Sequence, residues 1–355
     1  MKKIVLTGGG TAGHVTPNIA LMPELKKRGY DISYIGSYEG MEKDMIIETG
    51  TPYYGIATGK LRRYFDLKNF TDPFRIIKGY FEARSRLKKI HPDVIFSKGG
   101  FVAVPVVRAA HALKIPVIIH ESDMTPGLAN KLCIPVASKV CCNFPETLKY
   151  LPSDKAVLSG SPIRSELFEG NRRRGLDFCG FTDDKPVILI MGGSLGAVAV
   201  NEAIRAVLPE LLKDFQIIHL CGKGKTEEKL NDVTGYVQYE FIKEELRDLL
   251  AAADLIISRA GANAICEILA LRKPNILIPL SAAASRGDQI LNAKSFQKQG
   301  FSMLLQEEDI TNQKLLDTIH QVYKDHEKYQ KAMAASHQNQ AIPIIADLID
   351  QLASH

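Results

Sequence analysis

The chain has 355 residues, of which 45% are hydrophobic and 24% are charged, and its formal net charge at pH 7 is +5. This length favours two domains, and the ordinary globular composition excludes a disordered, collagen-like or coiled-coil protein. The surplus of positive charge suits a phosphate-rich ligand or an anionic membrane surface, but it is too small to predict nucleic acid as a partner.

Short apolar runs alternate with longer helical patterns along the chain. The runs do not alternate apolar with polar residues, which predicts strands that are buried on both faces, as in parallel sheets covered by helices. Strand, helix and strand in repetition indicate βαβ units. The expected strands cover residues 2–7, 32–36, 93–97, 116–120, 139–143 and 156–160, and then 186–193, 216–222, 236–240, 254–258, 275–280 and 302–305.

The same pattern of strand, glycine loop and helix occurs twice, in "KIVLTGGGTAGH" and in "VILIMGGSLGAVAVNEAI". We therefore predict an α/β protein with two doubly wound, Rossmann-like parallel-sheet domains, residues 1–162 and 163–330. The joint falls in the polar, charge-dense segment 160–186. Residues 331–355 are expected to form a C-terminal helix, for which a return to the N-terminal domain is one option.

Gly8, Gly10 and Gly13 in the first loop match the spacing G-x-G-x-x-G. Such glycines let the backbone approach a ligand closely, and the following helix offers free N–H groups to an anion. A nicotinamide site usually adds an acidic residue at the end of the second strand. Here the second run ends in Gly36 and Ser37, and Glu39 lies beyond it. The fingerprint is therefore incomplete, and a tight turn without a ligand remains an alternative.

Three later stretches also follow expected strands. In "MGGSLGA" the Ser194 hydroxyl could join backbone N–H groups around a phosphate, although a simple turn is the alternative. In "SRAGANAICE" a helix begins after small residues. The carboxylate of Glu267 could accept two hydrogen bonds from a ribose, or be an exposed helix side chain. In "GDQILNA" the side chains of Asp288, Gln289 and Asn292 suit sugar hydroxyls at the carboxyl edge of a sheet.

Seven motifs occur in one order: "GGGTAGHVTPNIAL", "SKGGFVAVPV", "HESDMTPGLANK", "GSPIR", "GGSLGAVAVNEAI", "SRAGANAICEILALRKPNILIPL" and "GDQILNA". Together they closely resemble the MurG family of UDP-N-acetylglucosamine transferases, from residue 2 to about residue 305. The resemblance implies a GT-B fold with two domains facing across a cleft. It also implies inverting, metal-independent transfer of N-acetylglucosamine from UDP to the C4 hydroxyl of MurNAc in undecaprenyl-pyrophosphoryl-MurNAc-pentapeptide, which converts lipid I to lipid II in peptidoglycan synthesis. No cofactor is expected, and the sequence has no Asp-x-Asp triplet.

The resemblance also implies where UDP-GlcNAc binds. Ile242 would contact the uracil, Glu267 the ribose hydroxyls and Gln289 the sugar hydroxyls. The full set of implied contacts is Thr11, Ala12, Gly13, Arg164, Ser194, Ile242, Ala262, Asn263, Ala264, Ile265, Cys266, Glu267 and Gln289. Further candidates near the cleft are Asp123, Asn130, Asp288 and Asn292.

Three positions depart from the common family pattern. Ala12 stands where glycine is frequent, and its methyl group is tolerable if its φ angle is negative. Asp123 stands where asparagine is common, and Asp288 where glutamine is common. The two acids put the details of the sugar contacts in doubt, but less so the reaction.

The acceptor hydroxyl must lose a proton as it attacks the anomeric carbon. His14 is our first candidate for the base, because histidine titrates near neutral pH and lies at the mouth of the glycine loop. Glu121 is the second candidate. Capping or ordering of the loop is the alternative role for His14, and a purely structural role is the alternative for Glu121. The charge of the leaving group would be met by helix N-termini, Ser194 and Arg164 rather than by a metal ion.

Residues 60–89 hold ten Lys or Arg and three Asp or Glu. Within them Phe70, Phe74, Ile77 and Phe81 share one helical face. This combination predicts docking on an anionic membrane surface, at the cytoplasmic face of the cell membrane. The alternative is that the apolar face belongs to the core.

Cysteine usage and hydropathy agree with that location. The six cysteines form no C-x-x-C pair and have no nearby histidine at zinc spacing, so we expect reduced thiols in the core of a cytosolic protein. Only three apolar residues lie between Lys3 and the first glycines, which predicts no signal peptide. No stretch reaches the roughly 18 uncharged residues of a spanning helix.

Other functions stay open on the sequence alone. Another GT-B transferase with a UDP-sugar and a lipid acceptor, such as a diacylglycerol glycosyltransferase, would share the cleft and the membrane patch. A UDP-sugar epimerase would need no lipid surface. A nicotinamide oxidoreductase is disfavoured by the missing acid after the second strand. A non-catalytic nucleotide-sugar binding module would leave His14 unexplained.

Overall fold

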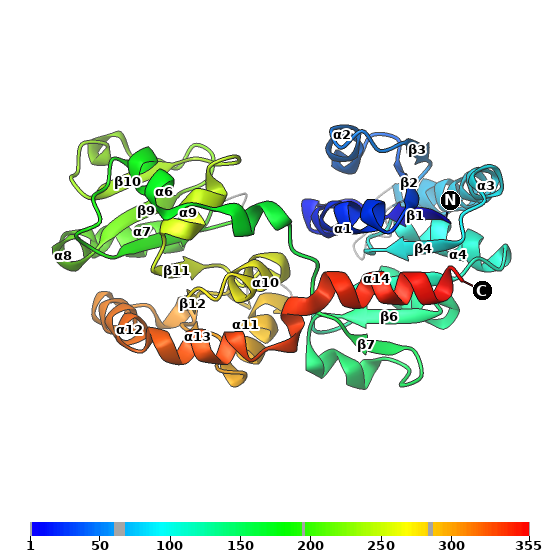
Figure 1. Cartoon of the computed structure of the whole chain (residues 1–355). Helices are drawn as coiled ribbons and strands as arrows, with labels where there is room; N and C mark the ends of the chain where they lie inside the picture. The colour runs from blue at the N-terminus through cyan, green and yellow to red at the C-terminus, as the bar shows by residue number, and fades with distance from the viewer. Residues whose placement is uncertain (1, 60–67, 194–195, 283–286, 355) are drawn as a thin grey trace. The chain divides into compact units, whose positions relative to one another are not determined.

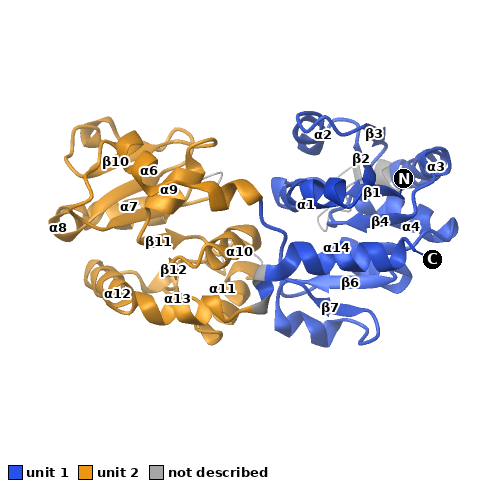
Figure 2. Cartoon of the chain, viewed as in Figure 1, with its two compact units in different colours: residues 1–164, 337–355 blue, residues 165–336 orange. Residues whose placement is uncertain are grey.

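The computed structural model describes residues 2–59, 68–193, 196–282 and 287–354. The chain forms two compact units, coloured separately in Figure 2. Unit 1 comprises residues 1–164 and 337–355, and unit 2 comprises residues 165–336. The chain thus leaves unit 1 two residues after the predicted boundary and returns to it before the last helix.

Unit 1 contains a seven-stranded sheet in the order β3-β2-β1-β4-β5-β6-β7, and its strands pair in parallel. All six strands predicted in this part of the chain are present. The prediction missed β3, because this short strand at the sheet edge contains Gly55 and is only partly buried. The strands are β1 (Lys2–Thr7), β2 (Tyr30–Ser37), β3 (Tyr53–Ile56), β4 (Val94–Ser97), β5 (Val117–Glu121), β6 (Lys139–Cys142) and β7 (Ala156–Leu158).

Helices cover both faces of this sheet (Figure 1). Val5 of β1 packs in the cluster that contains residues of α3 and α4, whereas Ile4 and Leu6 pack with residues of α1 and α14. Burial on both faces explains why the strands read as unbroken apolar runs. The helices are α1 (Thr16–Lys27), α2 (Met41–Ile47), α3 (Lys68–Ile90), α4 (Ala103–Ala112), α5 (Leu128–Cys133) and α14 (Ala341–Leu352), and a 3-10 turn, η1, spans Ala12–His14.

The C-terminal helix α14 is part of unit 1. Its Ile345 and Ile349 are completely buried in the cluster that α1 also lines. At the rim of this contact the Arg28 guanidinium donates to the carboxylates of Asp347 and Asp350, at 2.7 and 2.8 Å. The last residues therefore complete the hydrophobic layer on one face of the N-terminal sheet.

Unit 2 repeats the plan with a six-stranded parallel sheet in the order β10-β9-β8-β11-β12-β13. The strands are β8 (Val187–Met191), β9 (Gln216–Leu220), β10 (Tyr236–Tyr239), β11 (Leu255–Ser258), β12 (Asn275–Leu277) and β13 (Met303–Leu304). The helices are α6 (Arg172–Cys179), α7 (Val198–Ala206), α8 (Leu208–Asp214), α9 (Leu246–Ala252), α10 (Ala262–Ala270), α11 (Asp288–Lys298), α12 (Asn312–Lys324) and α13 (His326–Ala334).

The two strand orders confirm the predicted pair of doubly wound domains. In each sheet the next strands of the chain first add to one side of the unit's first strand, and the later strands add to its other side. This change falls between β1 and β4 in unit 1 and between β8 and β11 in unit 2. Open α/β sheets bind ligands at this switch point, outside the carboxyl ends of the strands. The two glycine loops found in the sequence begin there, after β1 and after β8.

The six cysteines are all buried, and none is in a disulfide. Burial raises the pKa of Cys133 and of Cys141 to about 12, so both thiols stay protonated and unreactive at neutral pH. The prediction that these cysteines lie in the core is confirmed.

Candidate active site

The glycine loop of unit 1 runs from the end of β1 into η1, and a buried carboxylate holds it. Glu42, on α2, is completely buried. It accepts hydrogen bonds from the backbone N–H of Gly10 at 3.2 Å and from the N–H and hydroxyl of Ser37 at 3.1 and 2.5 Å. The sequence pattern did not predict Glu42, because this residue lies within α2 and not directly after the second strand.

The same loop leaves little room for further atoms. A Cβ atom at Gly9 would lie 2.6 Å from the Glu42 carboxylate carbon, and one at Gly10 would lie 2.6 Å from the Phe101 ring. The protein's own side chains therefore occupy the space that the glycines leave. This packing explains why the G-x-G-x-x-G spacing does not indicate a dinucleotide-binding site here.

His14 ends the η1 turn and is half-buried. Its Nδ1 lies 2.9 Å from the Thr11 hydroxyl. Burial is the main cause that lowers the pKa of His14, to about 4; the charge of Lys98 lowers it further and the charge of Glu42 opposes this shift. The imidazole is therefore neutral at pH 7 and has a nitrogen lone pair with which to accept a proton.

Thr11 and Ala12 are exposed beside His14, and Gly13 is half-buried. Among the non-glycine residues that the structure describes, positive φ angles occur at His91, Lys114 and Arg272. Ala12 is outside this group, so its methyl group needs no left-handed backbone.

Glu121, the second candidate base, holds a loop. This residue at the end of β5 is 4% exposed. Its carboxylate accepts from the N–H groups of Asp123 and Gly127, at 2.9 and 3.0 Å, and from the Asn130 amide at 2.9 Å. Asp123 is half-buried on the loop that these bonds shape. The geometry favours loop ordering by Glu121 and Asn130 over proton transfer.

Three glycines of unit 2 face open space at the carboxyl ends of its strands. No atom of the described residues lies within 4 Å of a Cβ built on Gly193, which follows β8, on Gly261, which follows β11, or on Gly287, which precedes α11. Gly261 and Gly287 are the N-terminal caps of α10 and α11. Helix N-termini attract anions through their free N–H groups and their dipoles. Ser194 and its neighbour 195 lie outside the described residues.

The implied contacts on α10 divide by burial. Ala262, Asn263, Ala264 and Glu267 are half-buried, whereas Ile265 and Cys266 are buried with 0% and 5% exposure. The side chains of these two residues face the core, so a ligand would meet the backbone at most. Glu267 stays within reach of solvent on the second turn of the helix.

The candidates near α11 also have different surroundings. Asn292 is 1% exposed and donates to the Ala260 carbonyl at 3.2 Å, so it ties the start of α10 to α11. Gln289 is half-buried, and its Oε1 accepts from the Leu280 N–H at 3.1 Å. The amide nitrogen of Gln289 lies on the other side of its planar amide group and takes no part in that bond. Asp288, the first residue of α11, is half-buried.

Two further implied contacts lie on connecting segments. Ile242 is half-buried and follows β10, at the carboxyl edge of the unit 2 sheet. Arg164 is half-buried and is the last residue of the first segment of unit 1.

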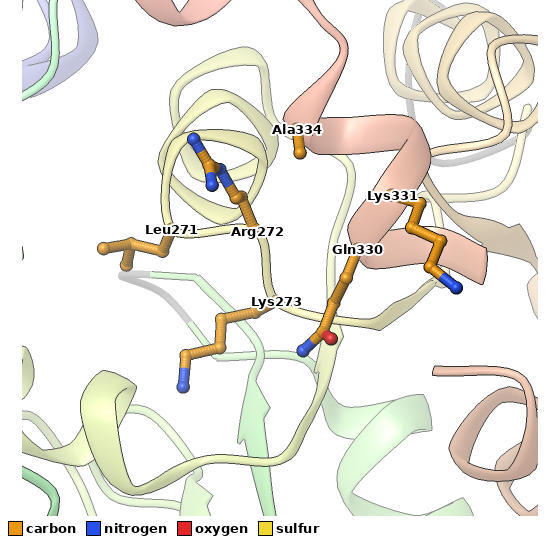
Figure 3. A pocket seen from close by; sticks show the side chains of 6 residues that line it. All are labelled: Leu271, Arg272, Lys273, Gln330, Lys331 and Ala334. Atoms are coloured by element: carbon orange, nitrogen blue, oxygen red, sulfur yellow. The ribbon is translucent and has the colours of Figure 1, made fainter. Parts of the chain in front are cut away.

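Unit 2 also has a pocket on the side of its sheet opposite the candidate nucleotide-sugar site. It is lined by Leu271, Arg272, Lys273, Gln330, Lys331 and Ala334 (Figure 3). Lys273 precedes β12, and its ammonium donates to the Ala251 and Ala253 carbonyls just before β11. The pocket thus lies at the amino ends of the strands, opposite the edge where open α/β sheets bind ligands.

Helix α3 presents an apolar face to solvent. Phe74, Ile77 and Phe81 are 75%, 55% and 60% exposed, while Leu87 of the same helix is completely buried. The alternative that this face forms the core is therefore wrong for these three residues. The side chain of Phe70 and residues 60–67 lie outside the described residues. Among the described helices none is long and apolar enough to cross a bilayer.

Comparison with known proteins agrees with this architecture. The model of the glycosyltransferase family 28 N-terminal domain matches residues 4–142, and that of the family 28 C-terminal domain matches residues 187–349. The chain belongs to this family. It is 65% identical to the UDP-N-acetylglucosamine–N-acetylmuramyl-(pentapeptide) pyrophosphoryl-undecaprenol N-acetylglucosamine transferase of Lachnoclostridium phytofermentans, over 99% of both chains. The corresponding transferase of Clostridium tetani is 58% identical, over 99% of this chain and 98% of that one.

Solved structures give the same result. The crystal structure of MurG from Acinetobacter baumannii has a TM-score of 0.77 and 29% identity, and the match covers 99% of this chain and 100% of that one. The UDP-GlcNAc 2-epimerase of Neisseria meningitidis has a TM-score of 0.70 at 16% identity, over 99% and 100% of the chains, which shows a shared fold alone. The chain is a GT-B glycosyltransferase of peptidoglycan synthesis, as the ordered motifs predicted.

Proposed function

We propose that this enzyme binds UDP-GlcNAc at the switch point of unit 2 and uses unit 1 to address lipid I, whose muramyl C4 hydroxyl receives the N-acetylglucosamine. The observation that carries the assignment to unit 2 is the open space at Gly193, Gly261 and Gly287. A diphosphate there would meet the N-terminus of α10 and its free N–H groups.

The nucleotide and the sugar would lie along the carboxyl edge of this sheet. Ile242, which follows β10, would contact the uracil, and Glu267 on α10 would accept from the ribose hydroxyls. Gln289 would meet the sugar hydroxyls with the part of its amide that Leu280 does not use.

In unit 1 we assign the general base to His14. A base at Nε2 requires the tautomer in which Nδ1–H donates to the Thr11 hydroxyl, 2.9 Å away. Nε2 would then take the proton of the C4 hydroxyl as that oxygen attacks the anomeric carbon, on the face opposite UDP. Attack from that face inverts the configuration. A base with its pKa near 4 is weak, so it acts best when proton transfer accompanies bond formation.

The departing UDP needs stabilisation of its growing negative charge. We assign this to the N-terminus of α10 and to Arg164, with no divalent cation. The lack of an Asp-x-Asp triplet in the sequence supports the assignment. Turnover should then be unchanged by EDTA, and a loss that Mg²⁺ restores would contradict it.

His14→Gln tests the base. With UDP-GlcNAc and a short-chain lipid I analogue, we expect UDP release to fall by roughly 10²–10⁴-fold, while calorimetry finds UDP affinity unchanged. Thr11→Val should lower turnover less, because only the tautomer preference is lost. Near-normal turnover of His14→Gln would dismiss the base assignment. Interconversion of the sugar without acceptor would indicate an epimerase instead.

We further propose that unit 1 docks on the anionic cytoplasmic face of the cell membrane through α3. Its exposed Phe74, Ile77 and Phe81 stand beside the exposed Arg75 and Lys78, which gives an apolar face with adjacent positive charge. An acceptor carried by a lipid requires such a contact.

Vesicle sedimentation tests the docking. The variant with Phe74, Ile77 and Phe81 all changed to Ser should bind vesicles containing phosphatidylglycerol several-fold more weakly than the native chain. Phe168→Ser is the matched control, because Phe168 is 58% exposed but lies in unit 2. Equal binding of both variants to anionic and neutral vesicles would overturn the proposal.

A further inference from the structure

Lys98 is a buried lysine at the switch point of unit 1. It follows β4 directly and is 1% exposed. Its backbone N–H donates to the Thr7 carbonyl at 2.9 Å, next to the start of the glycine loop. Its ammonium lies 2.8 Å from His120 Nδ1 and also donates to the Ser122 hydroxyl. A lysine is rarely buried without a specific arrangement of partners.

The protonation of His120 follows from its two neighbours. Its Nε2 lies 2.8 Å from the Gly160 carbonyl, which can only accept, so Nε2 carries the proton. Nδ1 must then accept from Lys98. Burial, and after it the charge of Lys98, holds the pKa of His120 well below its usual range, which agrees with a neutral ring. The Lys98 ammonium is thus fixed by an imidazole and a hydroxyl.

Glu42 approaches the same loop from another element. Its carboxylate accepts from the Gly10 N–H and fills the space over Gly9. On the β4 side, a Cβ built on Gly8 would lie 3.3 Å from the Lys98 Cβ. A buried anion on α2 and a buried cation after β4 therefore enclose the loop that leads to His14.

We propose that Lys98 and Glu42 are positioning residues for the transfer, which together fix the glycine loop and act on the His14 imidazole with opposite charges. The proposal rests on the proposed role of His14 as the base. Neither residue needs to touch the substrates. Their effect reaches the reaction through the place of His14 and through the potential at its ring.

The electrostatics around His14 support this arrangement. The charge of Lys98 lowers the pKa of His14 and that of Glu42 raises it. Two uncharged groups of the described residues also adjoin the loop: the Thr11 hydroxyl, and the phenol of Tyr34 on β2, which donates to the Gly8 carbonyl and whose pKa burial raises. Removal of either charge should therefore move the pKa of His14 in a predictable direction.

The test is an NMR titration of the imidazole signals of the full-length chain, with the His14 signal assigned by its loss in His14→Gln. In Lys98→Met we expect the pKa of His14 to rise by at least about 0.5 unit, and in Glu42→Gln to fall. Lys98→Arg keeps the charge and should stay near the native value. Lys149→Met, which removes an exposed lysine of the same unit, is the control for net charge.

The pH profile of turnover gives a second measurement. Because neutral His14 is the active form, its rate falls as pH drops through its pKa, so Lys98→Met should move the acid limb to higher pH. Lys98→Gln replaces Lys98→Met if the latter does not fold. An unchanged pKa in both charge-removal variants, with the native melting temperature retained, would overturn the proposal. Full activity of His14→Gln together with the expected shifts would instead refute the base assignment alone.

Discussion

The two units use the same strand, glycine loop and helix, yet their glycines have different surroundings. In unit 1 the positions of Gly9 and Gly10 are filled by Glu42 and Phe101. In unit 2 no atom of the described residues lies within 4 Å of a Cβ built on Gly193 or Gly261, although Gly192 and Gly196 pack against Ala197 and Cys221. The loop of unit 1 is packed by its own chain and presents a histidine, whereas unit 2 leaves space at Gly193 and at the start of α10. A glycine pattern therefore reports that something lies close to the backbone, but not whether it is a ligand.

In each unit a buried, positively charged side chain directly follows the fourth strand in chain order. Lys98 follows Ser97 in unit 1, and Arg259 follows Ser258 in unit 2. Arg259 is 8% exposed, donates to the Ile278 and Pro279 carbonyls at 3.1 Å each, and forms an ion pair with Glu307. Its charge stabilises the loop after β12, whereas Lys98 acts on an imidazole and a hydroxyl. The same position thus serves loop structure in one unit and the surroundings of His14 in the other.

The largest expected effect comes from filling the open space in unit 2. Gly261→Val should lower the affinity for UDP-GlcNAc by about 100-fold or more, because the branched side chain would occupy the start of α10 where we place the diphosphate. The fold should tolerate it, since Gly261 has φ −66° and no atom of the described residues lies within 4 Å of a Cβ built there. Calorimetry with UDP measures the affinity.

Gly127→Val is the matched control for that prediction. Gly127 also caps a helix, has φ −66° and has open space at its Cβ, but it lies in unit 1. It should keep the native affinity for UDP. Equal losses in both variants would mean that the effect comes from the backbone, and that the difference between the two loops carries no information about the ligand.

The sequence predicted the fold because buried parallel strands leave a strong local signal. Twelve runs without alternation became strands. The one further strand among the described residues, Tyr53–Ile56, was missed because it is a partly exposed edge strand with a glycine. The motif order predicted the enzyme family. What local pattern could not give was long-range contact. Glu42 acts on Gly10 from 32 residues away.

Burial was equally hard to predict within the candidate site. Spacing places Asn292 near the start of a helix, but only the packing shows that its side chain binds the Ala260 carbonyl inside the protein. Glu121 has the chemistry of a base, and its three hydrogen bonds to the loop come from the fold. Lys98 lies in the motif "SKGGFVAVPV", but the sequence does not predict its burial, because lysines are usually exposed.

A smaller effect is expected from a methyl group added to the packed loop of unit 1. Gly9→Ala should lower the free energy of unfolding by about 1–3 kcal/mol, because its Cβ displaces a carboxylate that binds Gly10 and Ser37. Urea denaturation measures the change. In the Glu42→Ala background the same substitution should cost little, since the space is then empty. An undiminished cost there would show that Glu42 is not the obstacle.

The smallest expected effect lies three residues further along the loop, at Ala12. Ala12 is exposed and needs no left-handed backbone, so Ala12→Gly gains no conformational relief and only adds freedom to the unfolded chain. The free energy of unfolding should fall by about 0.5–1 kcal/mol, and UDP affinity should not change. A gain in stability would mean that the methyl group of Ala12 is strained in this loop. The tight packing found at Gly9 and Gly10 would then also include Ala12, which already carries a side chain.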